Sequence, residues 1–288
     1  MELFLQQLIN GLVIGSTYAV VAIGFALVFT VLRVINFAHP ELFMFGMFAG
    51  QVAGSKLSDN LFVILVAGAL GAGLMGLALE RAVLRPLRGR DVLMTLIGTL
   101  GVAIMVQNGM ALIMSPDPVP FAHALPQTQV FAEISLSVPQ LFNFAVSLLL
   151  LGGVSFYVRR TRYGRATRAI AERPDVAAAF GVNVTRVSQV TVALASMMAG
   201  VAGVSVGMLY GSAWAFVGLL YGLKAFTIML VAGNRYFEGV IVIALALGVL
   251  EALVTGYLSS SLRDAVAFFV LIGVLYFRPN GLFGSYQT

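Results

Sequence analysis

Long apolar stretches alternate with short polar segments along the whole chain. The apolar stretches cover residues 8–32, 41–54, 61–79, 92–114, 139–158, 187–210, 215–233, 238–257 and 264–278. Most of them approach the roughly 20 residues that an α-helix needs to cross a bilayer. The pattern predicts one all-α polytopic membrane domain over residues 1–288, with about eight to ten transmembrane helices. Barrel strands would instead show short alternating segments.

The stretch 41–54 is short for a complete crossing. We expect it to be a broken or re-entrant segment, or to merge with a neighbouring stretch. The side on which the N-terminus lies stays open, because merging two stretches would reverse it. The N-terminus shows no basic region before its first apolar run, so we expect that run to be a permanent span and not a cleaved signal.

Arginine clusters lie beside the apolar stretches. The composition is 60% hydrophobic and 10% charged, whereas soluble domains carry roughly 25% charged residues. The net charge of +5 is concentrated in segments 80–91 and 159–186 and at Arg278. Such clusters follow the positive-inside rule, so we expect these two loops and the C-terminal tail to be cytoplasmic and expect no nucleic-acid partner.

The loop 115–138 has the opposite character. It contains no Lys or Arg, and it carries Asp117, Glu133 and prolines at 116, 118, 120 and 126. We expect an extended, extracytoplasmic loop. The chain has no cysteine, which rules out disulfides and thiolate metal sites within it.

Residues 174–180 predict a short helix in the basic loop 159–186. Pro174 suits the first turn of a helix, where its missing N–H costs nothing. Asp175 lies near the positive end of the helix dipole. Gly181 suits the left-handed position that ends a helix.

This short helix carries a small apolar face formed by Val176, Ala177 and Phe180. A helix of about two turns is unstable alone in water and needs a surface on which to bury that face. Two interpretations stand: the helix packs on its own membrane domain, or it docks on a cytoplasmic partner.

Glycine is abundant, with 31 residues. Two stretches space it at short intervals: Gly68, Gly71, Gly73 and Gly76 in one, and Gly200, Gly203, Gly207 and Gly211 in the other. The spacing favours close helix packing. Hinges in a moving transporter are the alternative.

Four segments in order resemble one family. They are INGLVIGSTYAVVAIGFALVF and VINFAHPELFMFGMF near the N-terminus, RAIAERPDVAAAFGVNVTRV in the basic loop, and EALVTGYLSSSLRDAVAFFVLIGVLYFRPNGLFG near the C-terminus. Over nearly its whole length the chain resembles the permease subunits of branched-chain amino-acid ABC transporters. It departs from the family at Pro40, where glycine is usual, and at 232–239, where a glycine-rich turn is usual.

The resemblance implies an assembly in the inner membrane. It implies a second permease chain, related or identical, two ATPase subunits that bind the ATP, and an extracytoplasmic solute-binding protein. It also implies that the basic loop couples the permease to the ATPase through residues Arg165, Arg168, Glu172, Pro174, Asp175, Val176, Phe180 and Gly181. The chain has only Lys56 and Lys224 as lysines, and neither lies in a P-loop pattern, so we expect no nucleotide or other cofactor on this chain.

The segment 36–41 is an unusual polar insertion next to a span. Pro40 interrupts a continuing helix, and non-helical backbone at membrane depth is tolerated only inside protein or beside a water-filled cavity. Asn36, His39 and Glu41 are therefore candidates for the translocation path. The alternative is a plain cytoplasmic turn after Arg33, with Glu41 solvated.

Lys224 lies inside an apolar stretch, where a charge is costly. We expect either a buried pair, with Glu251 as partner, or a side chain that extends to the membrane rim. A substrate ligand is disfavoured, because a buried cation does not suit the passage of a zwitterion. Arg235 and Glu238 are spaced to pair with each other.

Other functional classes fit less well. No HExxH pattern is present, and His39 and Glu41 lack a third metal ligand nearby, which argues against an enzyme. No selectivity-filter pattern indicates a channel. A secondary transporter would carry more intramembrane carboxylates than Glu251 and Glu238. The expected solutes are branched-chain amino acids, with urea, short amides or aromatic acids as the alternative.

Overall fold

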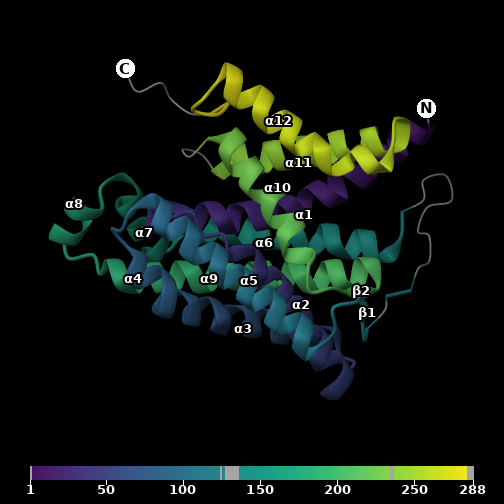
Figure 1. Ribbon diagram of the computed structural model, residues 1–288, viewed down its shortest axis with the longest axis horizontal. Helices are drawn as coiled ribbons and strands as arrows, with labels where there is room; N and C mark the ends of the chain where they lie inside the picture. Colours follow the sequence, from purple (N-terminus) through teal and green to yellow (C-terminus); the bar gives the residue numbers. More distant parts are fainter. Residues whose placement is uncertain (1, 124, 127–135, 234–236, 284–288) are drawn as a thin grey trace.

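The computed structural model describes residues 2–123, 125–126, 136–233 and 237–283. Its long helices run between two ends (Figure 1). We call the end with α4 (Arg85–Leu87), α7 (Arg162–Glu172) and α8 (Pro174–Ala179) the basic end. The end with strands β1 (Val119–Pro120) and β2 (Ser212–Ala213) is the hairpin end. Helix α1 (Glu2–Leu32) begins at the hairpin end, and α12 (Arg263–Phe277) finishes at the basic end.

The remaining elements are α1 (Glu2–Leu32), α2 (His39–Lys56), α3 (Leu61–Leu79), the π-helical turn η1 (Glu80–Leu84), α5 (Val92–Ile113), α6 (Val138–Arg160), α9 (Val184–Tyr210), α10 (Val217–Ala232), α11 (Phe237–Tyr257), the 3₁₀ turn η2 (Ser260–Leu262) and α12 (Arg263–Phe277). Each predicted apolar stretch coincides with a helix. In the described residues, 7 helical segments are long and apolar enough to cross a membrane, while α10 is shorter. The prediction of an all-α polytopic membrane protein is confirmed.

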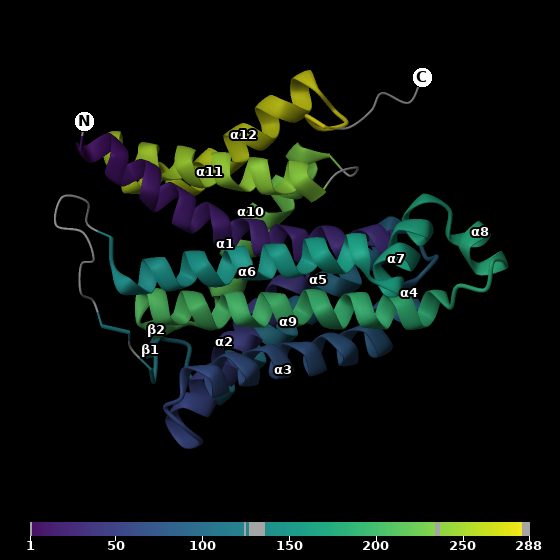
Figure 2. The same cartoon turned by 180° about the vertical axis from the view of Figure 1, so that it is seen from behind.

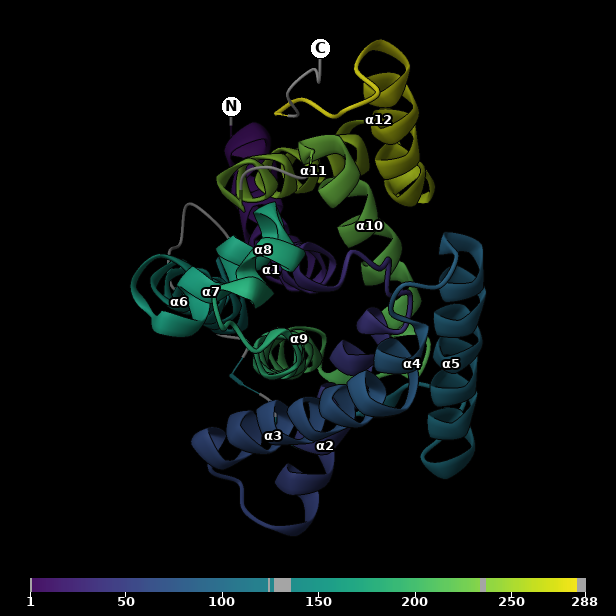
Figure 3. The same ribbon diagram turned by 90° about the vertical axis from the view of Figure 1, so that its left-hand side faces the viewer.

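Helices α1 and α9 form the centre of the bundle (Figure 3). Of the most apolar window of each helix, 83% is buried in α1 and 72% in α9, against 6% in α12. The outer helices α5 and α12 expose large apolar side chains, such as Ile97 and Phe269. An apolar exterior on a helix bundle suits contact with lipid or with another membrane chain.

The stretch 41–54 does not merge with its neighbours. It forms most of α2, and residues 33–38 separate α2 from α1. Pro40 occupies the first turn of α2, where it costs no hydrogen bond. Helix α2 then packs against α3 and α9.

A small antiparallel sheet closes the hairpin end. Val119 of β1 is opposite Ala213 of β2, and Phe121 N–H donates to Gly211 C=O at 2.9 Å. Gln51 Nε2 of α2 donates to Pro120 C=O at 2.8 Å. The two strands lie at the end of the bundle opposite α8 (Figure 2). The extended character expected for loop 115–138 holds in its described part, and residues 127–135 lie outside the described residues.

The basic loop contains a helix that the sequence analysis missed. Helix α7 precedes α8, and Thr161 caps it by accepting the Gly164 N–H at 2.9 Å. Thr167 and Ile170 face inward, while arginines cover the other side. The high arginine content concealed an amphipathic pattern with helical spacing.

Glycines bring the central helices into close contact. A Cβ built on Gly46 of α2 would lie 2.9 Å from the Gly200 carbonyl carbon and oxygen of α9. A Cβ on Gly248 of α11 would lie 2.5 Å from the Gly15 Cα of α1. The packing interpretation of the glycines therefore explains these helix crossings. Gly211 differs, because it ends α9 in a left-handed conformation with φ of 65°.

We predict that Gly46→Leu destabilises the protein by about 1–3 kcal/mol or more, because the new side chain overpacks the contact with α9. The matched control is Gly101→Leu on α5, where a Cβ meets nothing within 4 Å. Thermal unfolding in the same detergent compares the two. Equal melting temperatures for both variants would contradict the packing role.

Candidate functional site

The short helix in the basic loop begins where the sequence predicts and ends one residue earlier, at Ala179. Helix α8 starts at Pro174, and Gly181 follows its C-terminus with φ of +84°. The Gly181 N–H donates to Ala178 C=O at 3.0 Å, and the Val182 N–H donates to Ala177 C=O at 3.1 Å. These bonds satisfy the last carbonyl groups of the helix.

The apolar face of α8 is only partly buried by the protein itself. Ala177 is buried in a cluster with Val31 of α1, Ile170 of α7 and Val187 of α9. Phe180 is 85% exposed, and it lines a cavity of about 510 Å³ together with Val176 and residues of α7. Packing on its own membrane domain therefore accounts for Ala177 and leaves Phe180 uncovered in the described protein.

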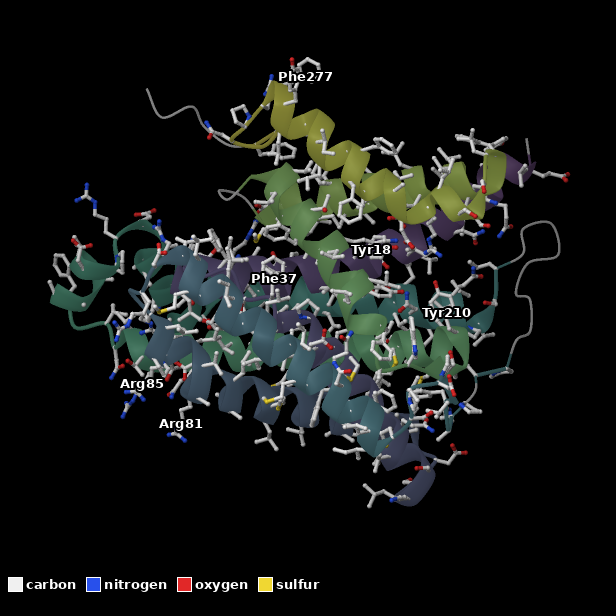
Figure 4. All side chains as sticks on the ribbon, viewed as in Figure 1. Tyr18, Phe37, Arg81, Arg85, Tyr210 and Phe277 are labelled. Carbon is white, nitrogen blue, oxygen red and sulfur yellow. The ribbon has the colours of Figure 1, made fainter. Side chains whose placement is uncertain are left out.

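The other residues expected in this loop gather at the same end. All the arginine and acidic candidates on α7 and α8 are exposed, namely Arg165, Arg168, Glu172 and Asp175. Arg81 and Arg85 also project outward at this end (Figure 4). The basic end thus presents a cationic surface that includes the exposed aromatic side chain of Phe180.

Arg33 links this loop to the segment that leads into α2, and the sequence analysis did not single it out for this role. Its backbone is left-handed, with φ of 54°, which is uncommon for a residue other than glycine. Its guanidinium donates to the carbonyl of Ala171, near the C-terminus of α7. Three residues further on, Asn36 begins the polar segment.

The segment 36–41 lies inside the protein. Exposed fractions are 1% for Asn36, 0% for His39 and 3% for Glu41. The interpretation of a plain turn with Glu41 solvated is therefore wrong. The Asn36 side-chain oxygen accepts the Ala38 N–H at 3.1 Å, and the His39 ring lies edge-on to Phe25 at 5.7 Å.

Several polar atoms of this segment have no hydrogen-bond partner in the described protein. They are Asn36 Nδ2, both ring nitrogens of His39, and Glu41 Oε2. Helix α10 crosses here through Gly218, where a Cβ would lie 2.8 Å from Pro40 C=O. Unsatisfied buried polar groups are costly, so a cluster of them indicates a place that water, solute or another chain satisfies.

Lys224 and Glu251 form a buried pair, which is one of the two alternatives that the sequence left open. Their Nζ and Oε2 atoms are 2.8 Å apart, and the side chains are 8% and 0% exposed. The alternative of a lysine extending to the membrane rim is wrong, because carboxylates hold the ammonium inside the bundle. Burying both charges together lowers the cost that either alone would carry.

Three further side chains complete this charge network, and the sequence analysis missed them. Tyr18 of α1 donates to Glu251 Oε2 at 2.7 Å and accepts from Lys224 Nζ at 2.9 Å. Asp264 Oδ1 lies 2.9 Å from Lys224 Nζ, and Arg263 Nε lies 3.4 Å from Glu251 Oε2. The network joins α1, α10, α11 and α12. Charged residues at the start of α12 were the available signal, but spacing along the chain does not show that they reach α10.

Two ion pairs lie at the basic end. Glu238 pairs with Arg159 of α6, and the pairing with Arg235 expected from the sequence lies outside the described residues. Arg88 donates to Ser188 Oγ at 2.8 Å and lies 3.9 Å from the buried Glu80. Burial lowers the pKa of Arg88 below its usual value.

The family model described as "Branched-chain amino acid transport system / permease component" matches residues 7–275. The chain is 36% identical to the high-affinity branched-chain amino acid transport system permease protein BraD of Pseudomonas aeruginosa, over 98% of this chain and 96% of that protein. It is 34% identical to the corresponding protein LivH of Escherichia coli, with the same coverage.

A solved structure shares the fold. A chain of PsaBC from Streptococcus pneumoniae in complex with Fab aligns with a TM-score of 0.51 at 12% identity, covering 96% of this chain and 92% of that chain. At this identity the likeness concerns the fold alone.

We predict that Lys224→Met and Glu251→Leu each destabilise the protein, because each leaves an opposite charge buried with fewer partners. The double variant should be less destabilised than the sum of the two, with a coupling of about 0.5–3 kcal/mol. A double-mutant cycle on thermal or denaturant unfolding measures this coupling. Strict additivity would show that the pair contributes no mutual stabilisation.

Proposed function

The chain belongs to the family of branched-chain amino acid transport system permease components, and on this premise we propose that it is the membrane subunit of an ATP-driven importer of branched-chain amino acids. The observation that carries the proposal is the pre-formed helix α8 at the basic end. The side chain of Phe180, which directly follows this helix, is 85% exposed. Such a helix is suited to insert into a groove of a cytoplasmic ATPase.

We propose that the basic end is cytoplasmic and the hairpin end extracytoplasmic, in an inner membrane. The arginines of segments 80–91 and 159–186 lie at the basic end, which is the side expected for Lys and Arg in short loops. Helix α1 begins at the hairpin end, so the N-terminal end of α1 would be extracytoplasmic. A solute-binding protein would then dock at the hairpin end.

The contacts of α8 support a mechanical role in coupling. Ala177 packs on Val31 near the end of α1, and Arg33 holds Ala171 just before α8. Both contacts lie next to the polar segment that contains Asn36, His39 and Glu41. A displacement of α8 by the ATPase would thus reach this segment through a short path of packed residues.

The same buried segment is our candidate for the wall of the translocation path. Its unpartnered polar atoms belong to Asn36, His39 and Glu41. These groups need partners in the assembled transporter, where a second permease chain or the solute can supply them. The exposed apolar faces of α5 and α12 offer a surface for that second chain or for lipid.

ATP would bind on two separate ATPase subunits and not on this chain. The two lysines are Lys56, at the end of α2, and Lys224, which is held by Glu251. Neither lies in a phosphate-binding loop. The chain would therefore not be an enzyme itself, and it would act by opening and closing a path.

We predict that Phe180→Asp uncouples the transporter, because a charge replaces the apolar side chain that would insert into the ATPase. Reconstituted with its ATPase and binding protein, the variant should lose most of its leucine uptake and its stimulated ATP hydrolysis. The matched control is Tyr163→Asp, an exposed aromatic residue of α7 on the same loop, which should retain both activities.

Membrane insertion of both variants is checked by yield and melting temperature. Normal uptake by Phe180→Asp would rule out docking through α8. Equal loss of uptake in both variants would show that any charge on this loop is harmful and would remove the special role of Phe180.

We predict that the purified chain alone hydrolyses no ATP, because it offers no phosphate-binding loop. Hydrolysis should appear when the ATPase subunits are added. A preparation of this chain that hydrolyses ATP, with a rate that follows the chain through each purification step, would contradict the assignment of ATP binding to the partners.

A further inference from the structure

A cavity with polar and apolar walls opens at the hairpin end, and neither the polar segment 36–41 nor α8 lines it. It measures about 410 Å³ and is lined by residues of α1, α6, α9, α11 and α12 together with Ser137, which precedes α6. This volume is within the range of small-molecule sites. Its place at the end proposed to be extracytoplasmic puts it where a solute would arrive.

One part of the lining is an ordered set of neutral polar groups. Gln140 Nε2 donates to Asn10 Oδ1 at 3.0 Å, and Gln140 Oε1 accepts the Ser137 N–H at 2.8 Å. Thr255 of α11 also lines the cavity, with its hydroxyl donating to Glu251 C=O at 2.7 Å. These bonds fix the side chains in place, so little rotamer entropy is lost when a ligand binds.

A second part of the lining is apolar. It consists of Val13, Ile14, Leu209 and Ala252. An inorganic anion gains nothing from such a wall, whereas an aliphatic side chain gains free energy by leaving water.

Arg263 is the charged side chain among the lining residues that the structure describes, and no acidic side chain accompanies it there. Its Nε lies 3.4 Å from Glu251 Oε2, and the side chain is 31% exposed. Glu251 is itself fully buried and held by Lys224 and Tyr18. The Glu251 carboxylate thus orients the Arg263 guanidinium. The two terminal nitrogens of this guanidinium carry four further N–H donors in a planar fork.

We propose that this cavity binds a small aliphatic amino acid on its way into the transporter, with the carboxylate of the ligand at Arg263 and its side chain on the apolar wall. The identity of the solute rests on the proposed function. The chemistry of the site, a fixed guanidinium beside an apolar wall, suits a ligand that carries a carboxylate on an aliphatic chain. An aliphatic amine without a carboxylate finds no acidic partner among the lining residues and is not bound.

The absence of cysteine from the chain allows a direct test. Thr255→Cys places a thiol in the cavity of the complete permease complex, reconstituted in nanodiscs. Its labelling by a maleimide is followed by mass spectrometry of this chain. Leucine at about ten times its Kd should slow the labelling about tenfold by mass action, and isopentylamine, which lacks the carboxylate, should not slow it.

Two second-site variants and one control make the result specific. Arg263→Lys, added to Thr255→Cys, keeps the charge beside Glu251 but loses the fork, and should shift the leucine concentration needed for protection about tenfold upward. Leu209→Trp narrows the apolar wall without touching the charge network and should also weaken protection. Ser55→Cys, exposed on α2 near the hairpin end and outside the cavity lining, should be labelled at a rate independent of leucine.

The outcomes separate this site from the proposed function. No protection of Thr255→Cys by leucine, or equal protection by isopentylamine, overturns the cavity as a carboxylate site. Unchanged protection in both second-site variants overturns it as well. Leucine uptake by the wild-type complex is measured in parallel. Uptake without protection would support the proposed importer and overturn the cavity as a binding site. Protection without uptake would support the cavity as a binding site and contradict the proposed importer.

Discussion

The ion pair between Lys224 and Glu251 constrains the arrangement of this membrane domain. Two opposite charges on α10 and α11 are buried 2.8 Å apart, and Tyr18 bridges both from α1. Neither charge is tolerable alone at this depth, so the three helices must meet here. The two carboxylate partners of Lys224 differ in exposure. The Asp264 side chain, at the start of α12, is 59% exposed, whereas the Glu251 side chain is fully buried. The arrangement of the hairpin end, including the cavity at Arg263, depends on this contact.

The two ends of the bundle differ in their physical character. The hairpin end contains hydrogen-bonded amide side chains, a small sheet and the charge network. At the basic end, arginines surround a short helix whose aromatic residue Phe180 stays exposed in the part of the chain that the structure describes. Between them, glycine contacts let α1, α2, α9 and α11 approach closely without polar groups. A solute and a driving subunit would thus act on opposite ends of one tightly packed core.

Individual residues show which structural features a local sequence pattern can predict and which it cannot. Pro174, Asp175 and Gly181 mark a helix of two turns because caps and turn residues act within a few positions of the chain. The sequence also named Glu251 as a possible partner of Lys224, since a charge in an apolar stretch is costly without an opposite one, but it left a position at the membrane rim open as the alternative. Helix α7 was missed because its arginines resembled a solvated loop, although Thr167 and Ile170 point inward. The sequence left open whether Glu41 is solvated in a turn, and its burial rules out that alternative. A neighbouring arginine indicates a membrane rim but says nothing about the depth of the turn that follows it.

The sequence by itself determined the class of protein, the position of nearly every membrane helix and the distribution of charge between the two faces. These properties depend on residue type and on spacing along one segment, which the bilayer and the helix period impose locally. Only the tertiary structure decided which distant residues meet. Tyr18 reaches Glu251 across 233 positions, Arg33 reaches Ala171 across 138, and Arg263 shares a cavity with Asn10. Such contacts arise from the packing of whole helices, and no local period in the chain encodes the side on which two helices will touch.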